Sequence, residues 1–274
     1  MKDIDFHFPL TLTLITLVFC SATCWMYVWA TGATLKHADS MTLEFFVRRI
    51  CPIGALSAGT IVMGMASYLF LTVAFVQMLK SFTPVMTMGG MVVFGLQTPS
   101  TQAVLCVLVI CAGTALAGYG ELNFHLVGFA CMLLAQVFEA LKLIFTQIVL
   151  QSLKFDLLET LYYITPASAV FVLVFALPME FSKMSAEDLA IVSEHAFAFV
   201  LSCLFAVLTN VINTFVIQFT NALVLKLVAT ARNAMLVLAT AFMGEPVTPL
   251  QVLGYSISLA GFFAYTFVEH RKKP

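Results

Sequence analysis

Long apolar segments restrict the fold of this chain more than any other feature of its sequence. Apolar runs of about 18–24 residues recur from one end to the other, and a helix of that length spans a hydrocarbon core of about 30 Å. Charged residues make up 10% of the chain and hydrophobic residues 61%, whereas a soluble domain carries roughly 25% charged residues. Because a backbone in lipid must satisfy its own hydrogen bonds, the sequence predicts an all-α polytopic membrane protein.

Nine spans are predicted within one transmembrane domain at residues 8–268, followed by a short tail at 269–274. They lie at 8–31, 51–73, 75–97, 102–119, 126–149, 157–180, 195–218, 222–243 and 249–268. Prolines at positions 52, 84 and 166 fall within or at the start of spans and are expected to kink or break them. The adjacent glycines 89 and 90 should allow a neighbouring helix to approach closely.

The distribution of Lys and Arg predicts the orientation. If the C-terminal tail faces the cytosol, the loops 32–50 and 150–156 do so too, and that side holds seven basic residues against two on the other. Such a bias is typical of cytosolic loops, so a cytosolic C-terminus is predicted. The seven residues are Lys36, Arg48, Arg49, Lys154, Arg271, Lys272 and Lys273.

An internal repeat is indicated when residues 66–95 are aligned with residues 212–241, an offset of 146 that places Lys80 on Lys226. Repeat one then covers 8–119 with four spans, and repeat two covers 126–268 with five. This pattern is typical of an inverted-repeat helical bundle, and one helix before residue 8 is missing from the pattern.

Four basic residues and one acid lie inside predicted spans: Lys80, Lys142, Lys226, Arg232 and Glu139. A charge at the bilayer centre costs about 2.5–3.5 kcal/mol, so four cost on the order of 10 kcal/mol unless they are paired or meet a ligand.

Different roles are expected for these charges. Glu139 and Lys142 are three residues apart on one helix, so they could pair with each other or contact a ligand. Lys226 could extend to the membrane surface or bind substrate. Lys80 and Arg232 are left without an acid of their own, and a basic pair in a cavity favours an anion with several oxygens, such as phosphate.

Neutral polar residues lie near these charges. Gln77 shares a helix face with Lys80, and Asn210 and Tyr163 interrupt other apolar segments. Each could contact the rest of a substrate, although each would also fit a hydrogen bond between helices.

The same residues lie in stretches that resemble the triose-phosphate/nucleotide-sugar translocator family of the drug/metabolite transporter superfamily. The resemblance covers nearly the whole chain and is closest to plant and protist probable sugar phosphate/phosphate translocators. It is carried by CPIGAL at 51–56, SYLFLTVAFVQMLKSFTPV at 67–85, YGE at 119–121, FEALKLIFTQIVLQ at 138–151, LYYITP at 161–166, TNALVLKLVATARN at 220–233 and GYSISLAGFFAY at 254–265.

The resemblance implies a ten-helix antiporter that exchanges a nucleotide sugar or sugar phosphate for a nucleoside monophosphate or inorganic phosphate. It implies that Lys80 and Arg232 bind the substrate phosphate. Most members have Lys where Arg232 stands, so the subtype signature differs here. The family's first helix is absent from the sequence, and the Golgi or endoplasmic reticulum is the expected compartment, ahead of a plastid envelope.

Other functions remain as alternatives. A truncated, transport-inactive paralogue could act as a membrane scaffold, and a proton-coupled exporter would have to rely on Glu139 as its acid. An enzyme is not expected, because the five histidines lie at span ends or in loops with no His/Asp cluster. No cofactor, metal or nucleic acid is expected, and the partners are the substrate, the lipid bilayer and, at most, a second copy in a homodimer.

Overall fold

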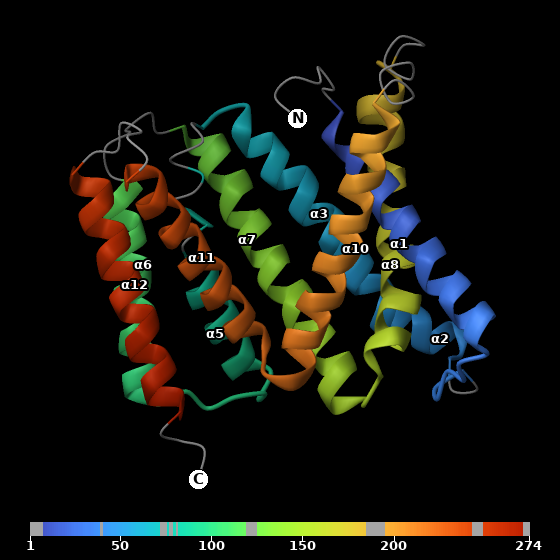
Figure 1. Cartoon of the computed structure of the whole chain (residues 1–274), viewed down its shortest axis with the longest axis horizontal. Coiled ribbons are helices and arrows are strands. Elements are labelled where there is room, and N and C mark those ends of the chain that lie inside the picture. The colour runs from blue at the N-terminus through green and yellow to red at the C-terminus, as the bar shows by residue number, and fades with distance from the viewer. Residues whose placement is uncertain are drawn as a thin grey trace. The chain divides into compact units, whose positions relative to one another are not determined.

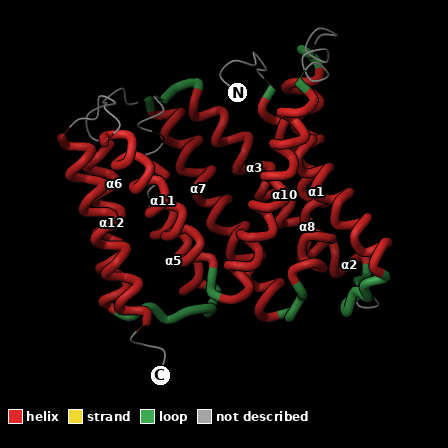
Figure 2. The backbone as a smooth tube through the Cα atoms, viewed as in Figure 1, coloured by secondary structure: helices red, strands yellow, loops and turns green. Residues whose placement is uncertain are grey.

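Helices make up nearly all of the structure, a computed structural model that describes residues 8–38, 41–71, 76, 79–80, 82–118, 125–184, 195–242 and 249–270. In Figure 2 every described residue belongs to a helix or to a loop, and these ranges contain no strand. The helices, with η for a turn of π-helix, are α1 (Pro9–Thr31), α2 (Leu43–Phe45), η1 (Phe46–Ile50), α3 (Cys51–Tyr68), α5 (Thr83–Val93), α6 (Thr101–Gly118), α7 (Leu126–Gln147), η2 (Ile148–Ser152), α8 (Leu157–Ala176), η3 (Leu177–Phe181), α10 (Ala196–Phe219), α11 (Ala222–Phe242) and α12 (Pro249–His270) (Figure 1).

The predicted spans correspond to these helices, so the prediction of an all-α membrane protein is confirmed. Within the described residues, five helical stretches are long and apolar enough to cross a bilayer: Pro9–Thr31, Leu43–Tyr68, Leu126–Ser152, Leu157–Phe181 and Ala196–Phe219. The predicted span 75–97 differs most, because α5 begins only at Thr83. Pro84 lies in the first turn of α5, where its missing N–H costs nothing, and it therefore marks a helix start.

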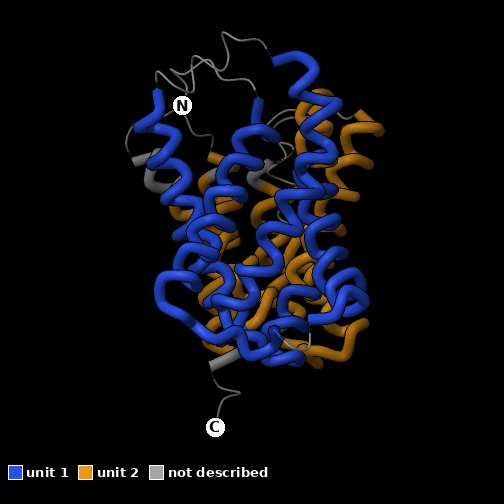
Figure 3. The backbone as a smooth tube through the Cα atoms, turned by 90° about the vertical axis from the view of Figure 1, so that its right-hand side faces the viewer, with its two compact units in different colours: residues 1–62, 145–220 blue, residues 63–144, 221–274 orange. Residues whose placement is uncertain are grey.

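The chain divides into two compact units, each built from two separate segments (Figure 3). Unit 1 comprises Met1–Val62 and Phe145–Thr220, and unit 2 comprises Met63–Ile144 and Asn221–Pro274. The boundaries fall inside α3 and α7. Each unit therefore combines parts of both halves of the sequence. This division differs from the predicted repeats, 8–119 and 126–268. The limits of those repeats stay a prediction.

Unit 1 is held together by apolar side chains from α1, α3, α8 and α10. Leu14 packs with Ala58, Ala169 and Val172, and further along α1 a second cluster joins α1 to α8 and α10 through Cys20, Cys24, Leu161, Val207 and Val211. At Gly54 the backbones of α3 and α8 touch, since a Cβ there would lie 2.9 Å from the carbonyl carbon of Ala167.

Buried carboxylates complete the helix ends of unit 1. Leu10 and Thr11 donate backbone N–H bonds of 2.9 and 2.7 Å to Glu180, and the Thr11 hydroxyl donates a third of 2.8 Å. Phe8, the N-cap residue of α1, makes no side-chain hydrogen bond that would cap the helix. Glu180 is 8% exposed, so it satisfies N-terminal donors of α1 that no intrahelical partner can reach.

The opposite end of α1 leads into a loop that is fixed to the start of α8. The backbone N–H of His37 donates to Glu159 at 2.8 Å, and the His37 ring lies 2.9 Å from the same carboxylate and stacks on Phe155. Lys36 pairs with Asp156 at 2.7 Å, and this hydrogen-bonded carboxylate raises the pKa of the Lys36 ammonium. The basic loops 32–50 and 150–156 thus meet at one end of unit 1.

Unit 2 has its closest helix packing between α6 and α12, which lie side by side (Figure 1). A Cβ at Gly113 would lie 2.6 Å from the backbone nitrogen of Ser258, so only glycine permits this approach. The Thr114 hydroxyl lies 3.2 Å from that of Ser258 across the same contact. Gly90 lies against the end of the Ile144 side chain of α7, whereas Gly89 has no atom of another residue near the position of a Cβ. The close approach expected at the paired glycines is thus found at Gly90 alone.

Candidate substrate site

An ion pair between α7 and α11 is the centre of the candidate site in unit 2. Lys226 of α11 pairs with Glu139 of α7, and their side chains are 18% and 24% exposed. The two residues are separated by 87 positions in the sequence. Glu139 lies in the middle of the apolar helix α7, and Lys226 lies one turn into the apolar helix α11.

Two further lysines act electrostatically on the Glu139 carboxylate. The charge of Lys226 acts most strongly, followed by that of Lys142, one turn along α7, and by that of Lys80. The sequence spacing predicted a pair between Glu139 and Lys142, whereas the ion pair of Glu139 is with Lys226. Lys226 is 18% exposed and pairs with Glu139, and its extension to the membrane surface and its contact with substrate both stay predictions.

Lys80 lies just before α5 and has an aromatic hydroxyl as neighbour. Its Nζ donates to the Tyr68 hydroxyl at 3.1 Å and lies 5.5 Å from the centre of the same ring. The Thr83 hydroxyl donates to the Lys80 carbonyl at 2.6 Å and also contacts Gln136 of α7. These contacts fix the turn at the start of α5, and with it the backbone from which Lys80 extends.

Arg232 and Gln77 are less closely associated with this cluster. Arg232 lies on α11 six residues after Lys226 and is exposed. Residues six apart on a helix point about 120° away from each other, so Arg232 and Lys226 occupy different faces of α11. Gln77 lies outside the described residues, and its predicted substrate contact stays a prediction.

Asn210 and Tyr163 belong to unit 1, where each contacts neighbouring helices or aromatic rings. The Asn210 amide lies 4.0 Å from the sulfur of Cys20, between α10 and α1. Tyr163 packs against Tyr162 and Phe155 with ring centroids 5.1 and 6.5 Å away. These contacts fit the packing role that the sequence left open for both residues, and their role toward a substrate stays a prediction.

Some functional contacts were missed by sequence reasoning. Tyr68 was not among the predicted site residues, although its hydroxyl is the hydrogen-bond partner of Lys80. Gln136, buried on α7 with 2% exposure, was also missed. Its position three residues before Glu139 was a usable signal, because residues three apart share a helix face.

Comparison with solved structures concerns the fold. A crystal structure of a protein aligns with 100% of this chain and 92% of its own, with a TM-score of 0.68 at 13% identity. At that identity the likeness concerns the fold alone.

Sequence comparison then identifies the family. The model of the Triose-phosphate Transporter family matches residues 4–266. A probable sugar phosphate/phosphate translocator of Arabidopsis thaliana is 33% identical over 279 residues, which cover 99% of this chain and 80% of that protein. Another of the same description is 32% identical over 276 residues, covering 99% and 81%. The chain belongs to the Triose-phosphate Transporter family, and the resemblance predicted from its motifs is confirmed.

Proposed function

We propose that the protein is an antiporter that exchanges a sugar phosphate or nucleotide sugar for inorganic phosphate or a nucleoside monophosphate. The observation that carries the proposal is the ion pair of Lys226 with Glu139 between the apolar helices α11 and α7, with the charges of Lys142 and Lys80 also acting on the same carboxylate. Its relatives are named probable sugar phosphate/phosphate translocators, which supports a phosphorylated sugar as cargo.

The charge of this group suits a phosphate ester. Three ammonium groups and one carboxylate leave a net charge of +2, and a phosphate monoester carries about −1.5 to −2 at pH 7. A bound phosphate would therefore neutralise the group almost completely. In a medium of low dielectric constant, such neutralisation lowers the cost of holding the charges within the membrane.

In the proposed cycle the substrate competes with Glu139 for Lys226. Before binding, the Glu139–Lys226 pair holds the lysine in place; on binding, phosphate oxygens take over part of that interaction. Lys80, a predicted phosphate ligand, supplies a further charge-assisted hydrogen bond. Arg232, the other predicted ligand, lies on a different face of α11 from Lys226 and would have to reach the phosphate from that side. The empty site keeps its excess positive charge and reorients slowly, so transport in one direction requires a return substrate.

The orientation and compartment are also part of the proposal. Lys36, Arg48, Arg49 and Lys154 belong to loops or helix starts that meet at one end of unit 1, as positive-inside topology requires. We place this end and the C-terminus in the cytosol, and the protein in the Golgi or endoplasmic reticulum membrane.

Counter-exchange in proteoliposomes tests the transport proposal. Vesicles preloaded with phosphate or a nucleoside monophosphate are offered labelled sugar phosphates and nucleotide sugars. We expect uptake only into preloaded vesicles, and a loss of at least about 100-fold in the Lys80→Ala variant, since a charge-assisted phosphate contact contributes about 1.5–3 kcal/mol and its loss also leaves an unmatched charge.

Lys154→Ala is the matched control, because Lys154 lies in the loop before α8 and should leave exchange unchanged. Normal counter-exchange by Lys80→Ala would contradict the proposed site. Absence of exchange with every phosphorylated substrate would contradict the proposed function and favour the membrane scaffold.

A further inference from the structure

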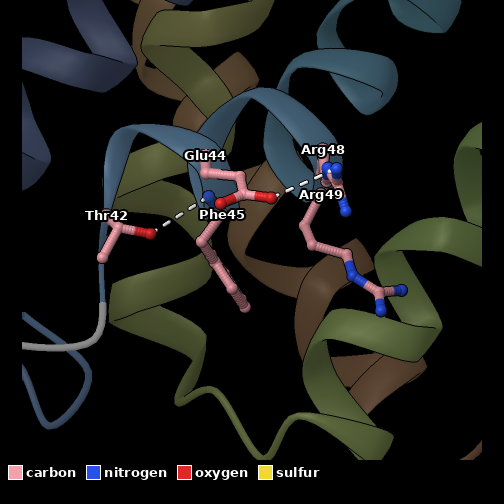
Figure 4. A pocket seen from close by; sticks show the side chains of 5 residues that line it. All are labelled: Thr42, Glu44, Phe45, Arg48 and Arg49. Atoms are coloured by element: carbon pink, nitrogen blue, oxygen red, sulfur yellow. Dashed lines mark hydrogen bonds and ion pairs between the residues drawn. The ribbon is translucent and has the colours of Figure 1, made fainter.

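A pocket at the basic end of unit 1 lies outside the candidate substrate site. It has a volume of about 240 Å³ and is lined by Thr42, Glu44, Phe45, Arg48 and Arg49 (Figure 4). Sites for drug-sized ligands measure about 300–1,000 Å³, so this pocket suits a smaller group. Its residues belong to α2, η1 and the loop before them, where α3 enters the membrane domain.

The membrane interface lies at this level of unit 1. Trp25, Tyr27 and Trp29 near the end of α1 are 50%, 55% and 87% exposed, and exposed Trp and Tyr are enriched where headgroups meet the hydrocarbon. The loop that follows α1 pairs with the start of α8 through Lys36 and Asp156. The pocket, one short loop away from α1, therefore lies near lipid headgroups.

The polar lining of the pocket suits an anion with several oxygens. Arg48 pairs with Glu44 at 3.2 Å, but the two side chains are 77% and 71% exposed, and such a surface pair is easily exchanged for another partner. Arg49 lines the pocket beside Arg48, and no dashed line joins it to the other residues in Figure 4. Thr42 accepts the backbone N–H of Phe45 at 3.2 Å, which leaves its hydroxyl proton able to donate.

Apolar side chains next to the pocket point to a lipid rather than a free solute. Leu43 and Val47 are 81% and 53% exposed and lie four residues apart, hence on one helix face. The same two turns thus present two guanidinium groups and an apolar strip. A ligand that satisfies both carries an anionic head and a hydrocarbon tail.

We propose that the pocket of Thr42, Arg48 and Arg49 binds the phosphate headgroup of an anionic phospholipid in the leaflet on the basic side of the membrane, with Leu43 and Val47 against its acyl chains. Bidentate binding of phosphate oxygens by arginine gives the site its selectivity for acidic over zwitterionic lipid. This site is independent of the transport proposal.

Native mass spectrometry of the detergent-purified protein tests the lipid site. Phosphatidic acid and phosphatidylcholine with the same acyl chains are added in turn, and bound lipid is counted. We expect selective retention of phosphatidic acid, and binding about 30-fold weaker in the Arg48→Gln/Arg49→Gln variant, because each basic residue at a membrane surface contributes about fivefold. Lys154→Gln, a basic residue at the same end outside the pocket, should bind like the unmodified protein.

A second pair of measurements separates lipid from free phosphate. Leu43→Ser/Val47→Ser should weaken the binding of phosphatidic acid, and inorganic phosphate at millimolar concentration should displace little of it. Equal retention of lipid by the arginine variant would overturn the proposal. So would full displacement by inorganic phosphate with no effect of the serine variant, which would make the pocket a site for free anions.

Discussion

The two units use charged residues in opposite ways. In unit 1 every charged residue of the described helices and loops lies at a helix end or in a connection, for example Glu159, Glu180 and Lys36, where it caps a helix or fixes a loop. In unit 2, Lys80, Glu139, Lys142 and Lys226 lie along or beside apolar helices. In unit 1 these charges stabilise helix ends and loops. In unit 2 the three lysines outnumber Glu139 along the apolar helices.

We interpret this difference as a division of roles: the charges of unit 1 stabilise the structure, and those of unit 2 are the proposed substrate site. The helix-end charges Glu159, Glu180 and Lys36 are met by backbone groups or by an opposite charge, so these three need no ligand. Three lysines against one carboxylate do not cancel, so an anion would stabilise them. If the distinction is correct, substitutions in unit 2 should alter transport specifically, and substitutions in unit 1 should alter stability alone.

The largest effect is expected for Lys226→Ala. Removal of one partner from a largely buried ion pair costs about 3–5 kcal/mol, because the other charge stays unmatched. We expect a marked fall in the melting temperature in detergent, measured with a thiol-independent dye, together with loss of counter-exchange.

The double variant Glu139→Gln/Lys226→Gln separates the two consequences. Without either charge the protein should regain most of its melting temperature, while counter-exchange stays lost because Lys226 binds phosphate. Recovery of exchange along with stability would show that the pair is purely structural and would weaken the contrast between the units.

A change of substrate preference is expected for Glu139→Gln. The variant raises the charge of the lysine group from +2 to +3, which favours substrates with one more negative charge. At about 12 Å and an effective dielectric constant of about 20, one unit charge contributes about 1.4 kcal/mol, or tenfold. Competition between a phosphoglycerate and a neutral-sugar phosphate in the exchange assay measures this ratio; an unchanged ratio would contradict a role for Glu139 in charge selection.

A smaller effect, on stability alone, is expected for Glu180→Gln in unit 1. The amide keeps one accepting oxygen but loses the charge that favours the N-terminus of α1, at a cost of about 1–2 kcal/mol. A fall of roughly 5 °C in melting temperature should accompany it, with the substrate KM unchanged. A shifted KM would mean that unit 1 also contributes to substrate affinity.

The smallest effect is expected for Lys36→Ala. Its ion pair with Asp156 is open to solvent, with side chains 66% and 48% exposed, and surface pairs contribute little to stability. Melting temperature and exchange should both match those of the unmodified protein. A measurable loss of either would show that the loop before α2 has a role beyond its contact with α8.

The sequence predicted the helices well because apolar length is a local property. The span predicted at 222–243 corresponds to α11, at Ala222–Phe242. Pro84, which was expected to kink or break the span 75–97, lies in the first turn of α5. The partner of Glu139 could not be predicted in this way. Spacing along one helix favoured Lys142, whereas packing of α7 against α11 brings in Lys226 from 87 residues away.

The structural carboxylates of unit 1 were also beyond local patterns. Glu180 is the last residue of the predicted span 157–180 and was given no role from the sequence, yet its oxygens accept three hydrogen bonds from Leu10 and Thr11. Nothing in the sequence near Pro9 shows that α1 lacks a capping side chain of its own. The capping of α1 by Glu180 therefore depends on tertiary structure.

The cap on α1 also sets an order for biosynthesis. Glu180 is 170 residues downstream of Leu10, and at about 5–20 residues per second the ribosome needs roughly 10–30 s to reach it. During that time α1 leaves the translocation channel with its first N–H groups open to water or to lipid headgroups. Since unit 1 is complete only when residue 220 has been made, the earliest helices of the chain must wait in the membrane, and chaperones that shield unfinished spans would act in that interval.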